Sequence, residues 1–481
     1  LGAARPLGGE RGFVVPLGLG DDPPAQAQYP VGWNLDAGNL LLFGIGGSGT
    51  TTALLTLATA LAELADPERA HIYAMDFGAG ELAPLERLPC VGAVIAAGEH
   101  ERQRRLLRRL HDELGVRRGL DPRTRAALPR TVLLLDGYAG FTSEHAEGAG
   151  DTSRDELARI WADGSEVGVH VAIAADRLGA VPLALSSLAQ QRLAFQLAEL
   201  ADYAQFGIPR RSVPRFSPGR AIAAGSGQVL QVAHPASVLA GLASKRASGA
   251  GGPAPIGVLP ARVPLDALSS ARRHDRDPWL LPMAIGDEAL APVGLELFDG
   301  DHALVTGPPR SGKTNTLLVT AQMAARMYPE VELLGVALRR SALRECGGLA
   351  TVARSPDEFD ALIDRLRGGN GIKLLLIDDA ETVDDPRRAL ADLLAAPGAG
   401  VHALVAGRAE TFRALGHWSS GARRSRTGLL LAPDLQMDGA LLGAALPRRP
   451  APPARPGCGY LVRPDGFELV QVAVADADSA G

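Results

Sequence analysis

Two glycine-rich stretches of the sequence follow the template of a phosphate-binding loop and differ in one charged side chain. Gly307–Thr314 reads GPPRSGKT, and Gly44–Thr51 reads GIGGSGTT. In such a loop, backbone N–H groups and the N-terminus of the next helix bind phosphate oxygens. A lysine reaches the β- and γ-phosphates, and a hydroxyl ligates Mg²⁺. The second stretch has all these groups, whereas the first has Thr50 in place of the lysine.

The second loop predicts a site for ATP and Mg²⁺. An aliphatic run further along the chain ends in Asp378, which we expect to lie on the magnesium side with Thr314. Asp379 follows, where a longer glutamate usually polarises the attacking water, so hydrolysis is expected to be slow. Glu381 should share the face of Asp379 if the strand continues, but too far along to replace it. The residues expected to bind the nucleotide are Gly307, Pro308, Pro309, Arg310, Ser311, Gly312, Lys313, Thr314 and Asn315.

The first loop predicts the same backbone shape without the catalytic groups. Loss of the contact from a lysine to a polyphosphate costs about 1.5–3 kcal/mol. Gly137 follows Asp136, so the water-polarising carboxylate is missing as well. We therefore expect this loop to bind nucleotide weakly at most and not to hydrolyse it. The residues expected to form its cradle are Gly44, Gly47, Ser48, Gly49, Thr50 and Thr51.

The elements that must position the two loops follow the same order in each half of the chain. An extended stretch leads into each loop and a helical run follows it. A strand, an aliphatic strand ending in aspartate, a Val/Ala-rich strand and a final strand after a Pro-Gly turn come next. Continuous aliphatic runs such as Val132–Leu135 and Leu374–Ile377 predict strands that are buried on both faces. The sequence therefore predicts an α/β chain of two tandem RecA-like P-loop NTPase modules, each a mainly parallel sheet flanked by helices.

The length and composition agree with two soluble modules. A chain of 481 residues is too long for one ordinary core. We expect a first module at 1–243, a Pro/Gly-rich linker at 244–258, a second module at 259–474 and a disordered tail at 475–481. The net charge of −5 argues against a chain that is cationic throughout. No stretch approaches the roughly 18 apolar residues that span a bilayer.

On these motifs the whole chain resembles the FtsK/SpoIIIE family of motor ATPases, and most of all the C-terminal tandem modules of the type VII secretion ATPases EccC and EssC. The most similar segments are Tyr29–Gly44, Leu374–Glu381 and Pro447–Ala473. The resemblance implies a place on the cytoplasmic side of the cell membrane, with a membrane anchor and an upstream ATPase module as partners. It also implies a possible hexamer and a small helical secreted protein as cargo, whose C-terminal signal docks on the last module.

The resemblance also implies that catalysis requires a lysine, an acidic pair and an arginine acting in trans. Neither module of this chain has all of these parts. We assign catalytic roles to Lys313, Asp378, Asp379 and Arg408 of the second module. Arg177 and Arg408 follow equivalent strands and could face a nucleotide or a neighbouring module, and a solvated loop arginine is the simpler interpretation of each.

Two other functions remain open on the sequence alone. The very basic segment Glu99–Arg118 could bind the backbone of DNA in a DNA translocase. However, Leu106, Leu110 and Leu114 recur at helical spacing, which predicts an amphipathic helix with a solvated arginine face. With the negative net charge, this favours protein cargo over DNA. A third possibility is a scaffold in which ATP is a static part, so ATPase activity is not settled by the motifs.

Overall fold

The computed structural model describes residues 4–7, 12–146, 151–243, 252–271, 278–368, 371–396, 400–447 and 453–476. The chain divides into two compact units, Leu1–Ile256 and Gly257–Gly481, which are called the first and the second module below. Residues 244–251 of the predicted linker and 477–481 of the predicted tail lie outside the described residues. At the start of that tail, Ala475 donates its N–H to Asn315, and Asp476 pairs with Arg326.

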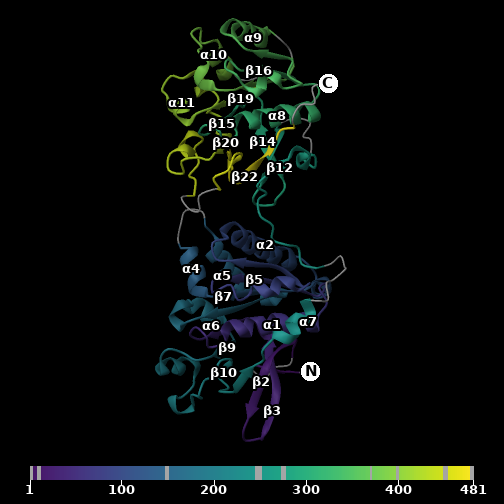
Figure 1. Ribbon diagram of the computed structural model, residues 1–481, viewed down its shortest axis with the longest axis vertical. Helices are drawn as coiled ribbons and strands as arrows, with labels where there is room; N and C mark the ends of the chain where they lie inside the picture. The colour runs from purple at the N-terminus through teal and green to yellow at the C-terminus, as the bar shows by residue number, and fades with distance from the viewer. Residues whose placement is uncertain are drawn as a thin grey trace. The chain divides into compact units, whose positions relative to one another are not determined.

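The first module contains a sheet with helices on both faces (Figure 1). Its strands are β1 Arg5–Pro6, β2 Val14–Asp22, β3 Ala27–Asn34, β4 Leu40–Phe43, β5 Ala70–Asp76, β6 Val91–Ala96, β7 Arg130–Asp136, β8 Val169–Ala175, β9 Gln191–Ala194, β10 Arg220–Ala223 and β11 Val229–Val232. Its helices are α1 Thr50–Leu64, α2 His100–Arg118, α3 Pro122–Ala127, α4 Tyr138–Glu144, α5 Ser153–Asp163, α6 Leu183–Leu188 and α7 Ala236–Ala243.

The second module repeats this plan. Its strands are β12 Val263–Pro264, β13 Trp279–Gly286, β14 Pro292–Leu297, β15 Ala303–Thr306, β16 Glu332–Val336, β17 Thr351–Ala353, β18 Lys373–Ile377, β19 Val401–Gly407, β20 Gly428–Leu431, β21 Cys458–Arg463 and β22 Gly466–Val474. Its helices are α8 Lys313–Met327, α9 Pro356–Gly368, α10 Ala389–Ala395 and α11 Ala409–Arg413.

Both sheets have the same strand order around the phosphate loop. In the first module the parallel part runs β9-β4-β8-β7-β5-β6, and in the second it runs β20-β15-β19-β18-β16-β17. Antiparallel strands extend each sheet beyond β9 and β20. In each module one strand, β8 or β19, therefore separates the loop strand from the strand that ends in aspartate. The predicted fold of two tandem α/β P-loop modules is confirmed.

The continuous aliphatic runs bury side chains on both faces of the first sheet. Leu40 and Leu42 of β4 pack in the core that includes α1. Leu41 and Phe43 point the other way, into the core that includes α2 and α5. Figure 1 shows α1 and α2 on either side of β5 and β7. Burial on both faces explains why these strands read as unbroken apolar runs rather than as alternating ones.

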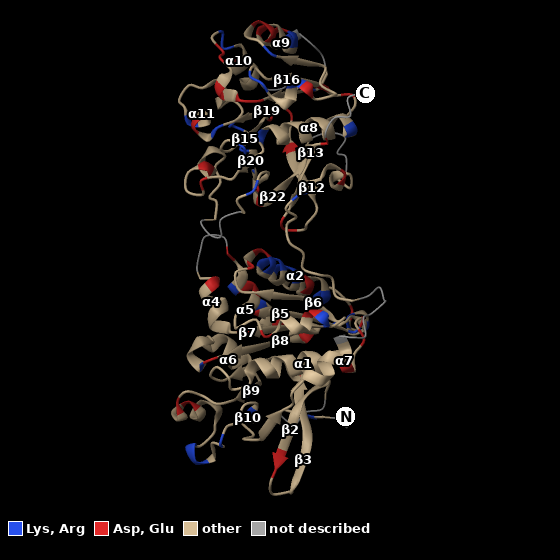
Figure 2. Cartoon of the chain, viewed as in Figure 1, with Lys and Arg blue, Asp and Glu red and all other residues tan. Residues whose placement is uncertain are grey.

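Helix α2 packs its leucine stripe as predicted, but its arginines are not simply solvated. Leu106, Leu110 and Leu114 are buried, while much of the ribbon of α2 is coloured as arginine positions (Figure 2). Arg102 donates to the carbonyl of Ile256, and Arg109 donates to the carbonyl of Ala254. These arginines hold the segment 252–256 against the first module, so the expectation of a solvated arginine face was wrong for them.

The next arginine of α2 is part of the core. Arg117 is only 3% exposed and forms an ion pair with Glu113. Its guanidinium also donates to the Thr131 hydroxyl and to backbone carbonyls at the amino ends of β7 and β8, those of Pro129, Val167 and Gly168. A rigid planar cation with five donors suits this role, because it satisfies several buried acceptors at once.

No helix within the described parts of either module is both long enough and apolar enough to cross a lipid bilayer.

Replacing Arg117 should destabilise the first module far more than replacing its neighbour Arg118. Arg117→Ala leaves buried carbonyls and Glu113 without their partner, so we expect a loss of roughly 3 kcal/mol or more in the free energy of unfolding. Arg118 pairs with Asp163 at the surface, so Arg118→Ala should cost less than about 1 kcal/mol. Denaturant unfolding followed by tryptophan fluorescence measures both changes. Equal effects would contradict the structural role assigned to Arg117.

Candidate nucleotide-binding site

The phosphate loop of each module is held by a second glycine turn. Gly312 precedes α8 with φ of 107°, and a Cβ on it would lie 3.0 Å from the backbone nitrogen of Gly457. Gly457 in turn donates its N–H to the carbonyl of Ser311 at 2.8 Å. The first module has the same arrangement. Gly49 also has φ of 107°, and a Cβ on it would lie 2.6 Å from the backbone nitrogen of Gly219. The Pro-Gly turns recognised in the sequence therefore support the loops.

Lys313 lies folded over its own loop. Its ammonium group donates to the carbonyls of Gly307 and Pro308, each at 3.0 Å. Burial lowers the pKa of Lys313, while the carboxylates of Glu381 and Asp379 oppose this shift. The amine that reaches the β- and γ-phosphates in such loops is therefore present and can exchange these carbonyls for phosphate oxygens.

The magnesium side of the second loop brings the predicted pair together. The Thr314 hydroxyl donates to Oδ2 of Asp378 at 2.9 Å, and Asp378 is buried. Ser341 donates to the same oxygen at 2.7 Å, and the N–H of Asp379 donates to Oδ1 at 3.1 Å. Hydroxyl and carboxylate oxygens side by side are ligands that Mg²⁺ prefers, so these residues fit the ion. Ser341, on the loop after β16, was not predicted because no motif marks it.

Two residues of this site adopt a backbone conformation that favours glycine. Asp379 has φ of 52° and Arg310 has φ of 66°. The first module has glycine at both equivalent positions, Gly137 at 77° and Gly47 at 78°. A side chain in this region costs of order 1 kcal/mol, and such strain is often found at functional sites. The second module therefore has side chains at two positions of positive φ, where the first module has glycine and avoids the strain.

Glu381 and Arg408 complete a pocket of about 370 Å³ over the second loop. Strand β18 ends at Ile377, and the chain turns into the 3₁₀ turn η9, Ala380–Thr382. This turn places Glu381 in the pocket with Asp379, where a continued strand would have carried it further along. The residues that line the pocket are Pro309, Arg310, Gly312, Lys313, Thr314, Asn315, Asp379, Glu381 and Arg408.

One predicted site residue, Asn315, and one further candidate, Arg177, have contacts or positions that the motifs did not indicate. The side chain of Asn315 binds the carbonyl of Ala473 and the N–H of Ala475, so its amide is committed to the protein. Arg177 is exposed and lies one position beyond the equivalent of Arg408. The strand register aligns Gly407 with Ala175, which puts Asp176 at the position of Arg408. The two arginines follow equivalent strands, as predicted, but they do not occupy equivalent positions.

The first loop keeps its hydroxyl–carboxylate pair but lies in an acidic environment. The Thr51 hydroxyl donates to Oδ2 of Asp136 at 2.8 Å, as in the second module. Burial raises the pKa of Asp136 to about 6, and the nearby carboxylates of Asp76 and Glu81 add to this shift, against the hydrogen bond from Thr51. Thr50 offers no positive charge. A triphosphate placed on this loop would face carboxylates without a compensating lysine.

Asp76 explains part of this difference. It is buried at the end of β5, and its carboxylate accepts the N–H groups of Gly78 and Leu82, both at 2.9 Å. The strand register places Ala337 at the same position in the second module. The first module thus uses a buried carboxylate to hold the loop that follows its second strand. An alignment of the two halves could have revealed that Asp76 has no counterpart in the second module, because Ala337 occupies its position.

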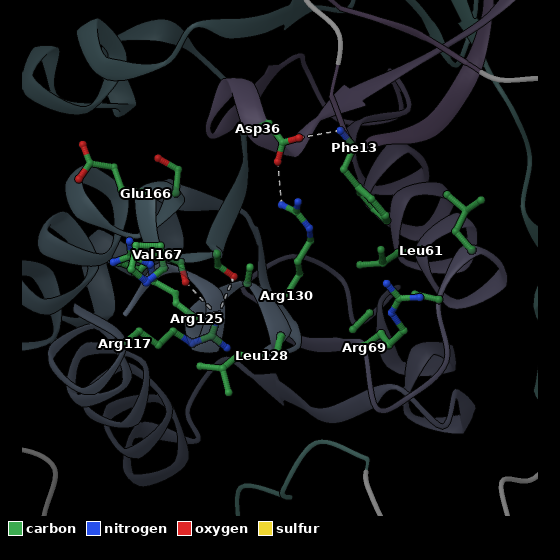
Figure 3. Close-up of a pocket in the computed structure, with 18 of the residues that line it drawn as sticks. Phe13, Asp36, Leu61, Arg69, Arg117, Arg125, Leu128, Arg130, Glu166 and Val167 are labelled. Carbon is green, nitrogen blue, oxygen red and sulfur yellow. Dashed lines mark hydrogen bonds and ion pairs between the residues drawn. The ribbon is translucent and has the colours of Figure 1, made fainter. Parts of the chain in front are cut away.

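The first module also has a cavity of about 520 Å³ at the amino ends of β5, β7 and β8, the edge of the sheet opposite its phosphate loop (Figure 3). Arg130 forms an ion pair with Asp36 there, at 2.9 Å, and Asp36 accepts the N–H of Phe13. Arg117 also lines this cavity. These pairs join the N-terminal strands to the sheet, so the cavity is no part of the nucleotide site.

Comparisons with known proteins support the motif analysis. The FtsK/SpoIIIE family matches residues 22–236. The chain is 30% identical over 527 residues to the ESX-4 secretion system protein EccC4 of Mycobacterium tuberculosis, covering 96% of this chain and 40% of that protein. It is 28% identical to the ESX secretion system protein EccC of Thermomonospora curvata, covering 96% and 39%. The chain therefore spans about two fifths of the length of these relatives.

Solved structures of such proteins share the fold. ATPases 2 and 3 of Thermomonospora curvata EccC, solved in complex with a signal sequence peptide, superpose with a TM-score of 0.75 at 24% identity, covering 96% of this chain and 93% of that one. ATPases 2 and 3 of Geobacillus thermodenitrificans EssC give a TM-score of 0.70 at 20% identity, covering 98% of each chain. The FtsK/SpoIIIE family model therefore matches the first module, and the chain as a whole is similar to the EccC secretion proteins and shares the fold of EccC and EssC.

Proposed function

We propose that the chain forms the tandem C-terminal ATPase modules of a type VII secretion ATPase and holds Mg-ATP in its second module. The observation that carries this proposal is the contrast between two loops of equal backbone shape. The second loop faces Lys313 and Arg408, whereas the first has Thr50 and Asp176 at those positions. A triphosphate is strongly anionic, so it should bind where the cations are.

Each residue of the second site has a distinct task in this proposal. The first N–H groups of α8 and the ammonium of Lys313 bind the phosphates. Thr314 and Asp378 hold Mg²⁺, which when bound neutralises phosphate charge and orients the terminal phosphate. Asp379 positions the attacking water. Its side chain is shorter than that of glutamate, so hydrolysis should be slow.

The relatives suggest the cellular setting. As the resemblance to these secretion proteins implies, we also propose an upstream ATPase module and a membrane anchor of the same system as partners, in an assembly that can be hexameric. One solved relative is the cytoplasmic domain of Thermomonospora curvata EccC, and we propose the same side of the membrane for this chain. The peptide in the related complex supports a secreted protein, through its signal sequence, as the cargo.

A static role for ATP is the second candidate, because the short Asp379 favours binding without turnover. ATP turnover by the intact chain separates the two possibilities. Hydrolysis that Lys313→Ala abolishes supports an ATPase, whereas binding without turnover supports a scaffold. A DNA translocase has less support, since Arg102, Arg109, Arg117 and Arg118 of α2 are engaged with protein groups.

Removing the lysine of the second loop should weaken nucleotide binding. Lys313→Ala should weaken binding of a fluorescent ATP analogue by about tenfold to a hundredfold, because a charge-assisted contact to the phosphates is lost. Thr50→Ala is the matched change in the first loop and should alter affinity less than twofold. Equilibrium titration with Mg²⁺ present measures both. A larger effect of Thr50→Ala than of Lys313→Ala would refute the assignment of ATP to the second module.

The buried carboxylate of the first loop should make stability depend on pH. The pKa of Asp136 is raised from 3.8 to about 6, so the folded state binds its proton more tightly than the unfolded state. The contribution of protonated Asp136 to the free energy of unfolding is therefore fully present below pH 3.8 and is lost as pH rises through about 6. Asp136→Asn should therefore stabilise the first module by about 1–3 kcal/mol at pH 7.5 and by almost nothing near pH 4.

Scanning calorimetry of the intact chain at these two pH values measures the difference. Asp136→Asn retains an oxygen that can accept the Thr51 hydroxyl, so the hydrogen bond itself is not the variable. Equal destabilisation at both pH values would show that the charge on Asp136 is compensated in the folded protein.

A further inference from the structure

The second phosphate pocket contains an ion pair that the sequence motifs do not include. Nε of Arg408 lies 3.3 Å from Oε1 of Glu381, and the backbone N–H of Arg408 donates to Oε2 at 3.4 Å. Arg408 directly follows β19, the strand between the loop strand and the strand that ends in aspartate. Its guanidinium and the Glu381 carboxylate therefore lie at the carboxyl edge of the sheet, beside the loop that cradles phosphates.

The backbone around this pair leaves room for the carboxylate. Gly407 ends β19, and a Cβ at this position would lie 3.2 Å from Oε2 of Glu381 and 3.1 Å from Cβ of Ala380. A larger residue would press against the turn that carries Glu381. The first module has Ala175 at the position of Gly407, and there the position of Glu381 is Ala139. The second module therefore has both the glycine that leaves room and the carboxylate that fills it, whereas the first module has neither.

The cations of the second pocket have acceptors within the protein itself. Lys313 donates to two loop carbonyls, and Arg408 contacts Glu381. Of the carboxylates near Lys313, Glu381 contributes most to raising the pKa of its amine, against the effect of burial. Glu381 therefore places a negative charge and acceptor oxygens near the two cations that a triphosphate needs. The contacts of Arg408 are long for a charge-assisted hydrogen bond, so an incoming oxyanion can replace them at little cost.

We propose that Glu381 acts as an internal substitute for the terminal phosphate, and that Arg408 exchanges Glu381 for the γ-phosphate when ATP binds. This inference rests on the proposed binding of ATP to the second module. A nucleoside diphosphate has no phosphate at that position, so it leaves the pair intact. Arg408 then favours a triphosphate over a diphosphate, Glu381 opposes this preference by competing for Arg408, and the break of their contact reports which nucleotide is bound.

The comparison within the chain supports this role. The module that keeps the lysine of its loop also keeps the Arg408–Glu381 pair, whereas the first module has Asp176 and Ala139 at these positions. An aspartate in place of the arginine would repel a γ-phosphate. The pair is therefore associated with the triphosphate site and is not a general feature of the fold.

The test compares affinities for ATPγS and ADP in the presence of Mg²⁺, measured by displacement of a fluorescent nucleotide from the intact chain. Arg408→Ala should weaken ATPγS binding about tenfold or more, because the γ-phosphate loses a charge-assisted partner and faces an unpaired Glu381. ADP binding should change less than about twofold. Glu381→Gln should tighten ATPγS binding several-fold, with little change for ADP.

Two further variants serve as controls. Arg408→Lys keeps the charge and should recover part of the ATPγS affinity. Glu332→Gln removes a carboxylate that pairs with Arg365 at the start of β16, the opposite edge of the sheet, and should leave both affinities unchanged. Affinities for ATPγS and ADP that change equally in Arg408→Ala, or that do not change at all, would overturn the exchange. A wild-type chain that binds neither nucleotide would instead overturn the proposed function on which it rests.

Discussion

Close contact between two glycine turns holds the phosphate loop of each module in shape. Gly312 lies against Gly457 in the second module, and Gly49 lies against Gly219 in the first. The contact involves backbone atoms alone, so it does not depend on any charged side chain. The loop also joins the central strand to its helix, and its loss would disturb the whole sheet. Selection for the fold can therefore preserve the loop in a module whose chemistry has changed.

Side-chain charge distinguishes two modules that share this backbone. The pair formed by Thr314 and Asp378 in the second module has a counterpart of nearly equal length in the first. The charges around the pair differ. The first module has Thr50 and Asp176 at the positions of Lys313 and Arg408, and it also buries Asp76 near its pair. We therefore view the first module as a folded partner and the second as the place where nucleotide state is read.

Much of the fold could be predicted from sequence because the decisive signals are local. Aliphatic runs identified the buried parallel strands, and the loop motif located the phosphate site. The place of Glu381 could be given only on the condition that the strand continued, and the chain instead turns at Ala380. Ser341 could not be found, since it approaches Asp378 through a loop with no motif. Arg177 and Arg408 follow equivalent strands as predicted, but only the strand pairing reveals that Asp176, and not Arg177, occupies the position of Arg408.

The most direct test of the central claim is a crystal structure of the chain grown with Mg²⁺ and ATPγS. The account predicts nucleotide density on the second loop, with Lys313 turned away from the carbonyls of Gly307 and Pro308 toward the phosphates, and an empty first loop. Density for the nucleotide on the first loop, with the second loop empty, would contradict it.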